Sequence, residues 1–521
     1  MQAPAPLLIV CSLIGLLVLS PLVYLFIRAF EGGGFAETVS AIFGTDTLVY
    51  GLRSLGLAAV VAVASVSLSI MLACFTLADD LPFRRLCTIL AVCPLAVPCY
   101  VGAAVYIGVF SPGGLLGGVT ASLGLSPGWF SGFWASAFVL TMFVYPLAYL
   151  PIRAGLRRVD RSPYEAARML GRSRLMAIRF GVLPQLRSSI VSGGLLVGLY
   201  ALGEFGAVSL LRCNTFTRVI YIQYESAFDR TGAAVSSLAL VGLIALVLLL
   251  GRWMRGTSYQ DRGGRGVSPL KWNIGHWRWG AFLVCLCLVV LAIVIPLLSL
   301  FSWWGRGSGS IDASSGLVDP LVNSLFLALM AGVIVVVLSI PIALLATRYP
   351  SRLSGMIDRM SHIGFGLPGL VIGLSLVFVA LRLVPAMYQS WFILILGYCV
   401  LFLALAIGPV RAGFEQASRT VDEAARTLGA GWWRRFRCLL LPVVRPGLFG
   451  AFLLVFISTS KELPCTLLLS PAGTHTLSTR VWQYTDEAMY AEASLPALAL
   501  IFLSGVLVAI LTWREELLEK S

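Results

Sequence analysis

The stretch EAARMLG (Glu165–Gly171) recurs as EAARTLG (Glu423–Gly429), 258 residues further along the chain, and six of the seven residues are identical. More distant positions match as well, which indicates that the 521-residue chain contains two related halves. At the same spacing the matches are Leu183-Pro184 with Leu441-Pro442, Arg187 with Arg445, and Glu204 with Glu462. At a spacing of 270 residues they are Ser54 with Ser324, Ser69-Ile70 with Ser339-Ile340, and Pro98 with Pro368.

Composition places both halves in a membrane. Hydrophobic residues make up 58% of the chain and charged residues 12%, and the mean hydropathy is +0.91. Apolar runs of about 20 residues, which span a hydrocarbon core, recur throughout, and no alternating strand pattern is visible. The sequence therefore predicts an all-α polytopic membrane protein with about 12 transmembrane helices. We expect them near 6–28, 52–77, 87–110, 132–154, 188–211, 233–251, 280–303, 322–346, 360–381, 391–410, 446–463 and 493–513.

The net charge of +14 fits the excess of Arg and Lys in cytoplasmic loops, so it does not indicate nucleic-acid binding. With both termini cytoplasmic, most of the 38 basic residues fall on the inner side. The first apolar run has no basic residue before it, and we expect it to be the first span rather than a removed signal peptide. The eleven cysteines and three histidines show no metal-ligand spacing.

The repeat defines the expected domains. The first half covers residues 1–251 with a loop near 157–187, and the second covers 280–521 with a loop near 411–445. A polar cytoplasmic linker, residues 252–279, joins them. Six spans each would give two parallel, pseudo-symmetric six-helix halves, with a substrate path between them.

The repeated segment has the signals of a short helix. Ser162 and Glu165 predict a capping box, which Thr420 and Glu423 repeat in the second copy. Gly171 and Gly429 can end each helix in a left-handed turn. A helix of about two turns is unstable alone, so we expect its small apolar face to dock on a partner. That face comprises Ala166, Ala167 and Leu170 in one copy, and Ala424, Ala425 and Leu428 in the other.

The pattern EAA, three residues, Gly, nine residues, then hydrophobic-x-Leu-Pro resembles the conserved loop of ABC importer permeases. Both copies are present, although Gly181 stands where the second copy has Leu439. The resemblance implies a type I permease fold whose two loops couple to two copies of a cytoplasmic ABC ATPase. The coupling residues it implies are Glu165, Ala166, Ala167, Gly171, Glu423, Ala424, Ala425 and Gly429.

The chain itself has no ATP-binding loop. Its three lysines, Lys271, Lys461 and Lys520, do not follow a glycine, so no Gly-Lys-Ser/Thr motif exists. We therefore expect a transport subunit that is not an enzyme and binds no cofactor. ATP and Mg²⁺ would be held by the partner ATPase.

Two acidic residues occupy equivalent places in apolar runs. Because a carboxylate in the apolar region is costly, Glu204 and Glu462 are expected to face a cavity or a partner. Facing one another across the path, they would make an oxygen-rich station suited to hard cations, and they are the candidate metal ligands. The alternative is that both lie at the outer interface, where they hydrogen-bond a loop or pair with Lys461.

Longer stretches after each loop resemble the fused permeases of ferric-iron importers of the bacterial inner membrane. The resemblance implies ferric iron as cargo, delivered by a periplasmic binding protein that contacts Arg218, Arg480, Glu225 and Glu487. These residues could equally pack on their own span ends. Thiamine, or another small organic cation or phosphonate, remains an alternative cargo. An ion-coupled secondary transporter and a structural or scaffold membrane protein are the alternatives from other classes.

Overall fold

The structure is a computed structural model that describes residues 4–31, 34–124, 126, 128–255, 272–307 and 316–518. Within these ranges the regular elements are helices, and no strand occurs. Ten described helices are long and apolar enough to cross a membrane, or eleven if one bent pair counts as a span. The twelve expected spans are therefore not all present as continuous helices. Most of the expected linker, residues 256–271, lies outside the described residues.

Long helices make up most of the fold. They are α1 (Ala5–Glu31), α3 (Thr45–Leu77), α7 (Gly132–Arg157), α10 (Leu183–Gly203), α13 (Arg230–Arg255), α16 (Val318–Arg348), α19 (Trp391–Gln416), α22 (Leu441–Lys461) and α25 (Tyr490–Leu518). Helices α14 (Arg278–Val289) and α15 (Ile295–Gly307) form one candidate span through a π turn at Val290–Val294. Short helices α2 (Gly34–Ile42) and α6 (Gly117–Ser122) lie in connections.

Two expected spans, 87–110 and 360–381, are interrupted at a proline. In the first, α4 (Arg84–Leu90) and a 3₁₀ turn (Cys93–Ala96) meet α5 (Cys99–Phe110) at 91°. In the second, α17 (Arg352–Ile363) and a 3₁₀ turn (Gly364–Gly366) precede α18 (Gly369–Leu383). Pro98 and Pro368 both adopt extended backbone, with ψ of 143° and 142°. A proline has no N–H and disfavours helical backbone in the residue before it, which favours a break at each position. Proline alone does not force the break, because Pro146 and Pro341 lie inside continuous helices.

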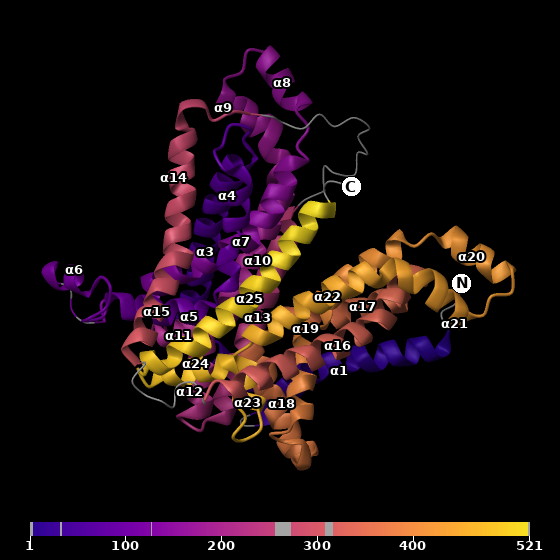
Figure 1. The fold of residues 1–521 in the computed structure, drawn as a ribbon. Coiled ribbons are helices and arrows are strands. Elements are labelled where there is room, and N and C mark those ends of the chain that lie inside the picture. The colour runs from indigo at the N-terminus through magenta and orange to yellow at the C-terminus, as the bar shows by residue number, and fades with distance from the viewer. Residues whose placement is uncertain are drawn as a thin grey trace.

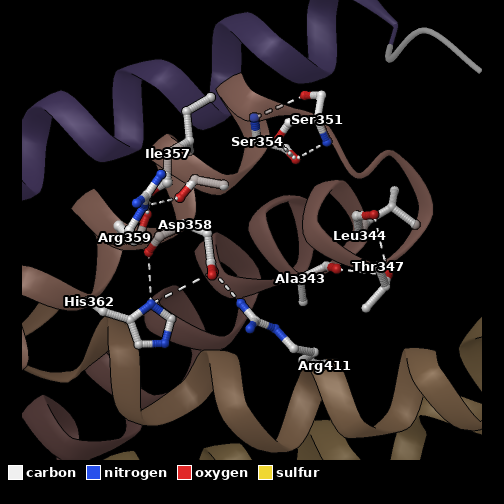
Figure 2. Close-up of polar contacts among 12 residues, drawn as sticks. Ala343, Leu344, Thr347, Ser351, Ser354, Ile357, Asp358, Arg359, His362 and Arg411 are labelled. Carbon is white, nitrogen blue, oxygen red and sulfur yellow. Dashed lines mark hydrogen bonds and ion pairs between the residues drawn. The ribbon is translucent and has the colours of Figure 1, made fainter. Parts of the chain in front are cut away.

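Polar contacts fix α17 at its start and near its end (Figure 2). Ser351 and Ser354 form a capping box, with N···O distances of 2.9 and 3.1 Å. Further along, the carboxylate of Asp358 accepts a hydrogen bond from Arg411 of α19 and lies 3.7 Å from His362 Nδ1. The first part of this broken span is thus bound to the neighbouring long helix.

The expected spans 188–211 and 446–463 also end early, because α10 stops at Gly203 and α22 at Lys461. Short helices follow: α11 (Gly206–Leu210) and α12 (Phe216–Glu225) in one half, α23 (Pro464–Leu469) and α24 (Leu477–Asp486) in the other. The hydroxyls of Ser54 and Ser324 accept hydrogen bonds from the first amides of α12 and α24, at 2.9 and 2.8 Å. The two matching serines therefore stabilise the start of the equivalent helix in each half.

The first helix of each half packs on the other half. Helix α1 contacts α16, α17 and α18, and its buried residues Cys11, Ile14 and Val18 belong to the core of the second half. Helices α14 and α15 contact α4 and α5, and Cys285 and Trp303 belong to the core of the first half. Before α14, the carboxylate of Asp80 accepts the amides of Ile274 and Gly275 (2.9 and 2.6 Å).

Figure 1 shows two arms that diverge from a common base. Helix α8 (Ser162–Met169) lies at the free end of one arm and α20 (Arg419–Thr427) at the free end of the other. The short helices α11, α12, α23 and α24 lie where the arms meet. Helix α1 runs along the second arm, so the N-terminus lies near α20 and α21 (Trp432–Arg435).

The contact of α15 with α5 of the other half gives a test of this packing. A Cβ on Gly108 would lie 2.1 Å from the Trp303 ring, so Gly108→Ala forces α5 and α15 apart. Overpacking of this kind costs about 1–3 kcal/mol. We expect Gly108→Ala to lower the melting temperature of the purified protein in scanning fluorimetry. Gly242→Ala is the matched control, because nothing lies within 4 Å of its Cβ position. Equal melting temperatures for the two variants would contradict the packing.

Candidate functional site

A cavity of about 470 Å³ lies between the two halves. Its wall combines the breaks of all four interrupted helices: Pro98 and Glu204 from the first half, Pro368 and Glu462 from the second. The two glutamates singled out in the sequence therefore line one cavity. Most of the wall is apolar, including Phe143, Leu147, Leu196, Leu199, Leu401, Phe402 and Leu405.

Glu462 caps α23. Its Oε1 accepts the amide of Cys465 (3.0 Å), and its Oε2 accepts both the amide (2.9 Å) and the hydroxyl (2.7 Å) of Thr466. A carboxylate at a helix N-terminus also interacts favourably with the helix dipole. The side chain reaches this position because Gly369 has none, as a Cβ there would lie 2.6 Å from Glu462 Oε1.

Glu204 plays the matching part at α11. Its Oε1 accepts the amide of Ala207 (3.1 Å), and its backbone carbonyl accepts the Thr217 hydroxyl (2.7 Å). The ψ angles of Glu204 and Glu462 are 129° and 128°, so the chain turns in the same way at both. Of the alternatives left open by the sequence, hydrogen bonding to the following segment is present at both glutamates.

Lys461 does not pair with a glutamate in the described part of the chain. Its ammonium donates to the carbonyl oxygen of Leu95 at 2.8 Å and lines the same cavity. Leu95 belongs to the first half and Lys461 to the second, so this contact joins the halves beside the cavity.

A resident metal centre has no further support. Among the described residues, no group of three or more His, Cys, Asp or Glu side chains could hold a metal ion. Glu204 and Glu462 remain candidate cargo ligands, but three donors already occupy the Glu462 carboxylate.

Sequence reasoning missed several polar residues of the cavity, namely Cys99, Tyr100 and Tyr200, and gave Lys461 a different role. They escaped notice because the repeat does not preserve them. The matching positions in the other half are Gly369, Leu370, Ser458 and Gly203. A comparison of the two halves for differences, rather than for identities, would have found them.

The EAA helices, α8 and α20, present the same side chains to solvent. Leu170 is 82% exposed and Leu428 87% exposed, although both are apolar. Gly171 and Gly429 follow with φ of 78° and 79°, so the expected left-handed ends are confirmed. Exposed leucines at the same place in both halves indicate a surface that a partner covers.

The two predicted capping boxes are wrong. Helix α8 begins at Ser162, whose amide and hydroxyl both donate to Asp160 (3.0 and 2.9 Å), while Glu165 pairs with Arg161 at 2.6 Å. These donors hold the pKa of the Asp160 carboxyl below its usual range. Helix α20 begins at Arg419 and takes Thr420 into its first turn. An aspartate two residues earlier can satisfy a helix start as well as a serine can.

Gly181, the departure from the loop pattern, permits close packing. A Cβ there would lie 2.9 Å from the backbone of Tyr164 in α8. The π turn that contains Gly181 (Ile178–Val182) therefore supports the first EAA helix directly.

The four candidate contacts for a binding protein lie on or beside α12 and α24. Arg218 donates to Asn214, and Arg480 donates to Gln483 (3.3 Å) while its guanidinium lies 5.7 Å from the Tyr484 ring centre. Gln483 in turn donates to Glu487 (3.3 Å), and Glu225 is exposed at the end of α12. Their contact with a partner stays a prediction.

Comparison with known proteins agrees with the two halves. Residues 65–258 and 339–521 each match the family described as "Binding-protein-dependent transport system inner membrane component". The chain belongs to this family. The permease is 31% identical to an Fe(3+)-transport system permease protein of Haemophilus influenzae, over 98% of both chains. It is 22% identical to a ferric transport system permease protein of Actinobacillus pleuropneumoniae, over 97% of this chain and 77% of that one.

A third relative carries the name of a 2-aminoethylphosphonate transport permease. This protein of Salmonella typhimurium is 23% identical over 36% of the permease and 72% of its own length. Membership of the family makes the chain a multi-pass inner-membrane permease subunit of an ABC transporter. It also implies a periplasmic binding protein and an ABC ATPase as partners.

The capping role of Glu462 can be tested by stability. Glu462→Ala removes the acceptor of two backbone amides, while the Thr466 hydroxyl can still donate to the Glu462 carbonyl oxygen. Glu204→Ala removes the side-chain acceptor of one amide. Loss of a helix cap costs about 0.5–2 kcal/mol. We expect the melting temperature to fall more for Glu462→Ala than for Glu204→Ala, and Glu462→Gln to lie between Glu462→Ala and the wild type. A wild-type melting temperature for Glu462→Ala would contradict the cap.

Proposed function

We propose that the permease is the membrane subunit of an ATP-driven importer of ferric iron, which a periplasmic binding protein delivers. The main support is the Fe(3+)-transport relative, which matches almost the whole length of both chains. The second ferric transport relative supports the same cargo.

The route runs through the cavity between the halves. ATP binding would draw two identical ATPase subunits together, and with them the EAA helices at the ends of the two arms. The arms would then rock about their common base, so that the cavity opens alternately to each side of the membrane. In Figure 1 the EAA helices lie at the free ends of two diverging arms, which suits a motion of this kind. In this arrangement both termini lie in the cytoplasm, and Arg218, Arg480, Glu225 and Glu487 face the binding protein.

Breaks in the helices suit such a route. Cargo can meet backbone and polar groups at mid-membrane only where helices are interrupted and their ends line a cavity. Glu204, Glu462, Pro98 and Pro368 supply these interruptions here. If the broken pairs α4–α5 and α17–α18 are each counted as one span, the permease has two pseudo-symmetric halves of six spans each.

A phosphonate is the second candidate cargo. The Salmonella relative supports it by name, and the Lys461 ammonium in the cavity would suit an anion. An ion-coupled mechanism has lost its support, since the family is one of binding-protein-dependent transport.

The cargo can be identified by reconstituting the transporter in liposomes. We expect liposomes containing the permease and its ATPase, supplied with the loaded binding protein, to take up labelled ferric iron only when ATP is present. Labelled 2-aminoethylphosphonate and thiamine serve as the comparison cargoes. Uptake of either compound without any uptake of iron would contradict ferric iron as the cargo. Uptake of iron without ATP would contradict ATP-driven transport.

The EAA helices can be tested separately. Leu170→Asp and Leu428→Asp each place a carboxylate on the surface proposed to meet the ATPase, and burial of an unpaired polar group costs about 2 kcal/mol or more. We expect transport to fall at least about tenfold in each variant, with an unchanged melting temperature, because both leucines are exposed. Leu353→Asp, at a half-exposed leucine of α17, is the control. Wild-type transport by both EAA variants would exclude these helices as the coupling elements.

A further inference from the structure

Each EAA helix follows a long helix after a short connection. Helix α7 ends at Arg157 and α8 begins at Ser162, while α19 ends at Gln416 and α20 begins at Arg419. A helix of about two turns is only marginally stable by itself. Displacement of α8 or α20 therefore moves the long helices efficiently only if these connections are held in place. In each half a polar side chain from another helix holds the connection.

In the first half the holding residue is Gln185, in the first turn of α10. Its Oε1 accepts the Asp160 amide (2.9 Å), and its Nε2 donates to the Asp160 carbonyl oxygen (3.1 Å). Nε2 also donates to the carbonyl oxygen of Gly181 (2.6 Å), so both hydrogens of the side-chain amide are used. Because the Asp160 carboxylate accepts both donors of Ser162, the start of α8 is tied to α10.

In the second half the holding residue comes from a different helix. Arg348, the last residue of α16, donates from Nη2 to the carbonyl oxygen of Ala417 at 2.8 Å, two residues before α20 begins. A hydrogen bond from a charged donor is stronger than one between neutral groups. Neither side chain recurs in the other half. Val443 occupies the position that matches Gln185, and Ala78 occupies the position that matches Arg348.

The two holding residues lie on helices that lead to different places. Helix α10 ends at Gly203, and the next residue, Glu204, lines the cavity and accepts an amide of α11. Helix α16 instead carries Ser324 near its other end, where the hydroxyl accepts the first amide of α24. Helix α24 lies where the two arms meet (Figure 1). The first EAA helix is thus connected to the cavity wall and the second to the base of the arms.

We propose that Gln185 and Arg348 are positioning residues that give the two EAA helices different tasks. Through Gln185, movement of α8 displaces α10 and the cavity wall. Through Arg348, α16 connects α20 with α24, which carries Arg480 beside the binding-protein surface, so this path reports docking to the ATPase. The inference rests on the proposed function, in which an ATPase displaces both EAA helices. Two identical ATPase subunits would then act on unlike connections.

The test uses the permease with its ATPase in liposomes, and measures ATP hydrolysis and iron uptake with and without the loaded binding protein. We expect Gln185→Leu to keep the stimulation of ATP hydrolysis by the binding protein, but to lower the iron transported per ATP by about fivefold or more. We expect Arg348→Leu to lose most of that stimulation. Arg348→Lys keeps a charged donor and should restore it.

Matched controls are Val443→Ala, at the position equivalent to Gln185, and Arg352→Leu, which removes an exposed charge of α17. Both should behave as the wild type. Hydrogen exchange of the purified complex gives a local readout that does not depend on transport. Amides of α8 should exchange faster in Gln185→Leu only, and amides of α20 faster in Arg348→Leu only.

Wild-type stimulation and wild-type transport per ATP in both variants would overturn the inference and leave the proposed function intact. The same defect in both variants would overturn the division of tasks. ATP-driven uptake of another cargo, with the two defects separated as expected, would uphold the inference and contradict ferric iron as the cargo. Uptake by the wild type without ATP would overturn both.

Discussion

Where a helix is interrupted inside the membrane, its free backbone amides must find hydrogen-bond acceptors within the protein, because lipid tails supply none. The structure meets this requirement at two matched places. Glu204 accepts the amide of Ala207, and Glu462 accepts those of Cys465 and Thr466. Without these carboxylates α11 and α23 would begin with unsatisfied donors, and the cavity would lose two of its walls.

The same requirement separates the two functions that a charged residue can have in a membrane. A carboxylate in the apolar region suggests a ligand site from sequence, and here it first completes the backbone of a short helix. Lys461 is less conspicuous in the sequence, yet it lines the cavity, and its one hydrogen bond to Leu95 leaves the ammonium further donors. Binding therefore depends on which polar groups remain unused after the fold has been satisfied, and only the contacts reveal this.

Sequence periodicity and the internal repeat predicted the helical class, the long spans and the positions of both EAA helices. They could not predict the interruptions, because a proline in an apolar run breaks the helix at Pro368 but not at Pro146 or Pro341. The capping box at Ser162 was wrong for a local reason, since Asp160 satisfies the start of α8 from two residues earlier. The one at Thr420 was wrong because α20 begins one residue earlier, at Arg419. In the site, identity between the two halves pointed to Glu204 and Glu462. It did not point to Tyr100, Tyr200 and Cys99, because other residues occupy the matching positions.

The reciprocal packing of α1 and α14–α15 has a consequence for biosynthesis. The first half remains without α14 and α15 until residues 278–307 leave the ribosome. Helix α1 contacts α13 of its own half, but it gains its contacts with α16–α18 only when the second half is made. Neither core is therefore complete until synthesis has passed the middle of the polypeptide. The two halves cannot fold one after the other as independent domains. Joining both halves in one polypeptide keeps each waiting helix beside its eventual groove at high effective concentration.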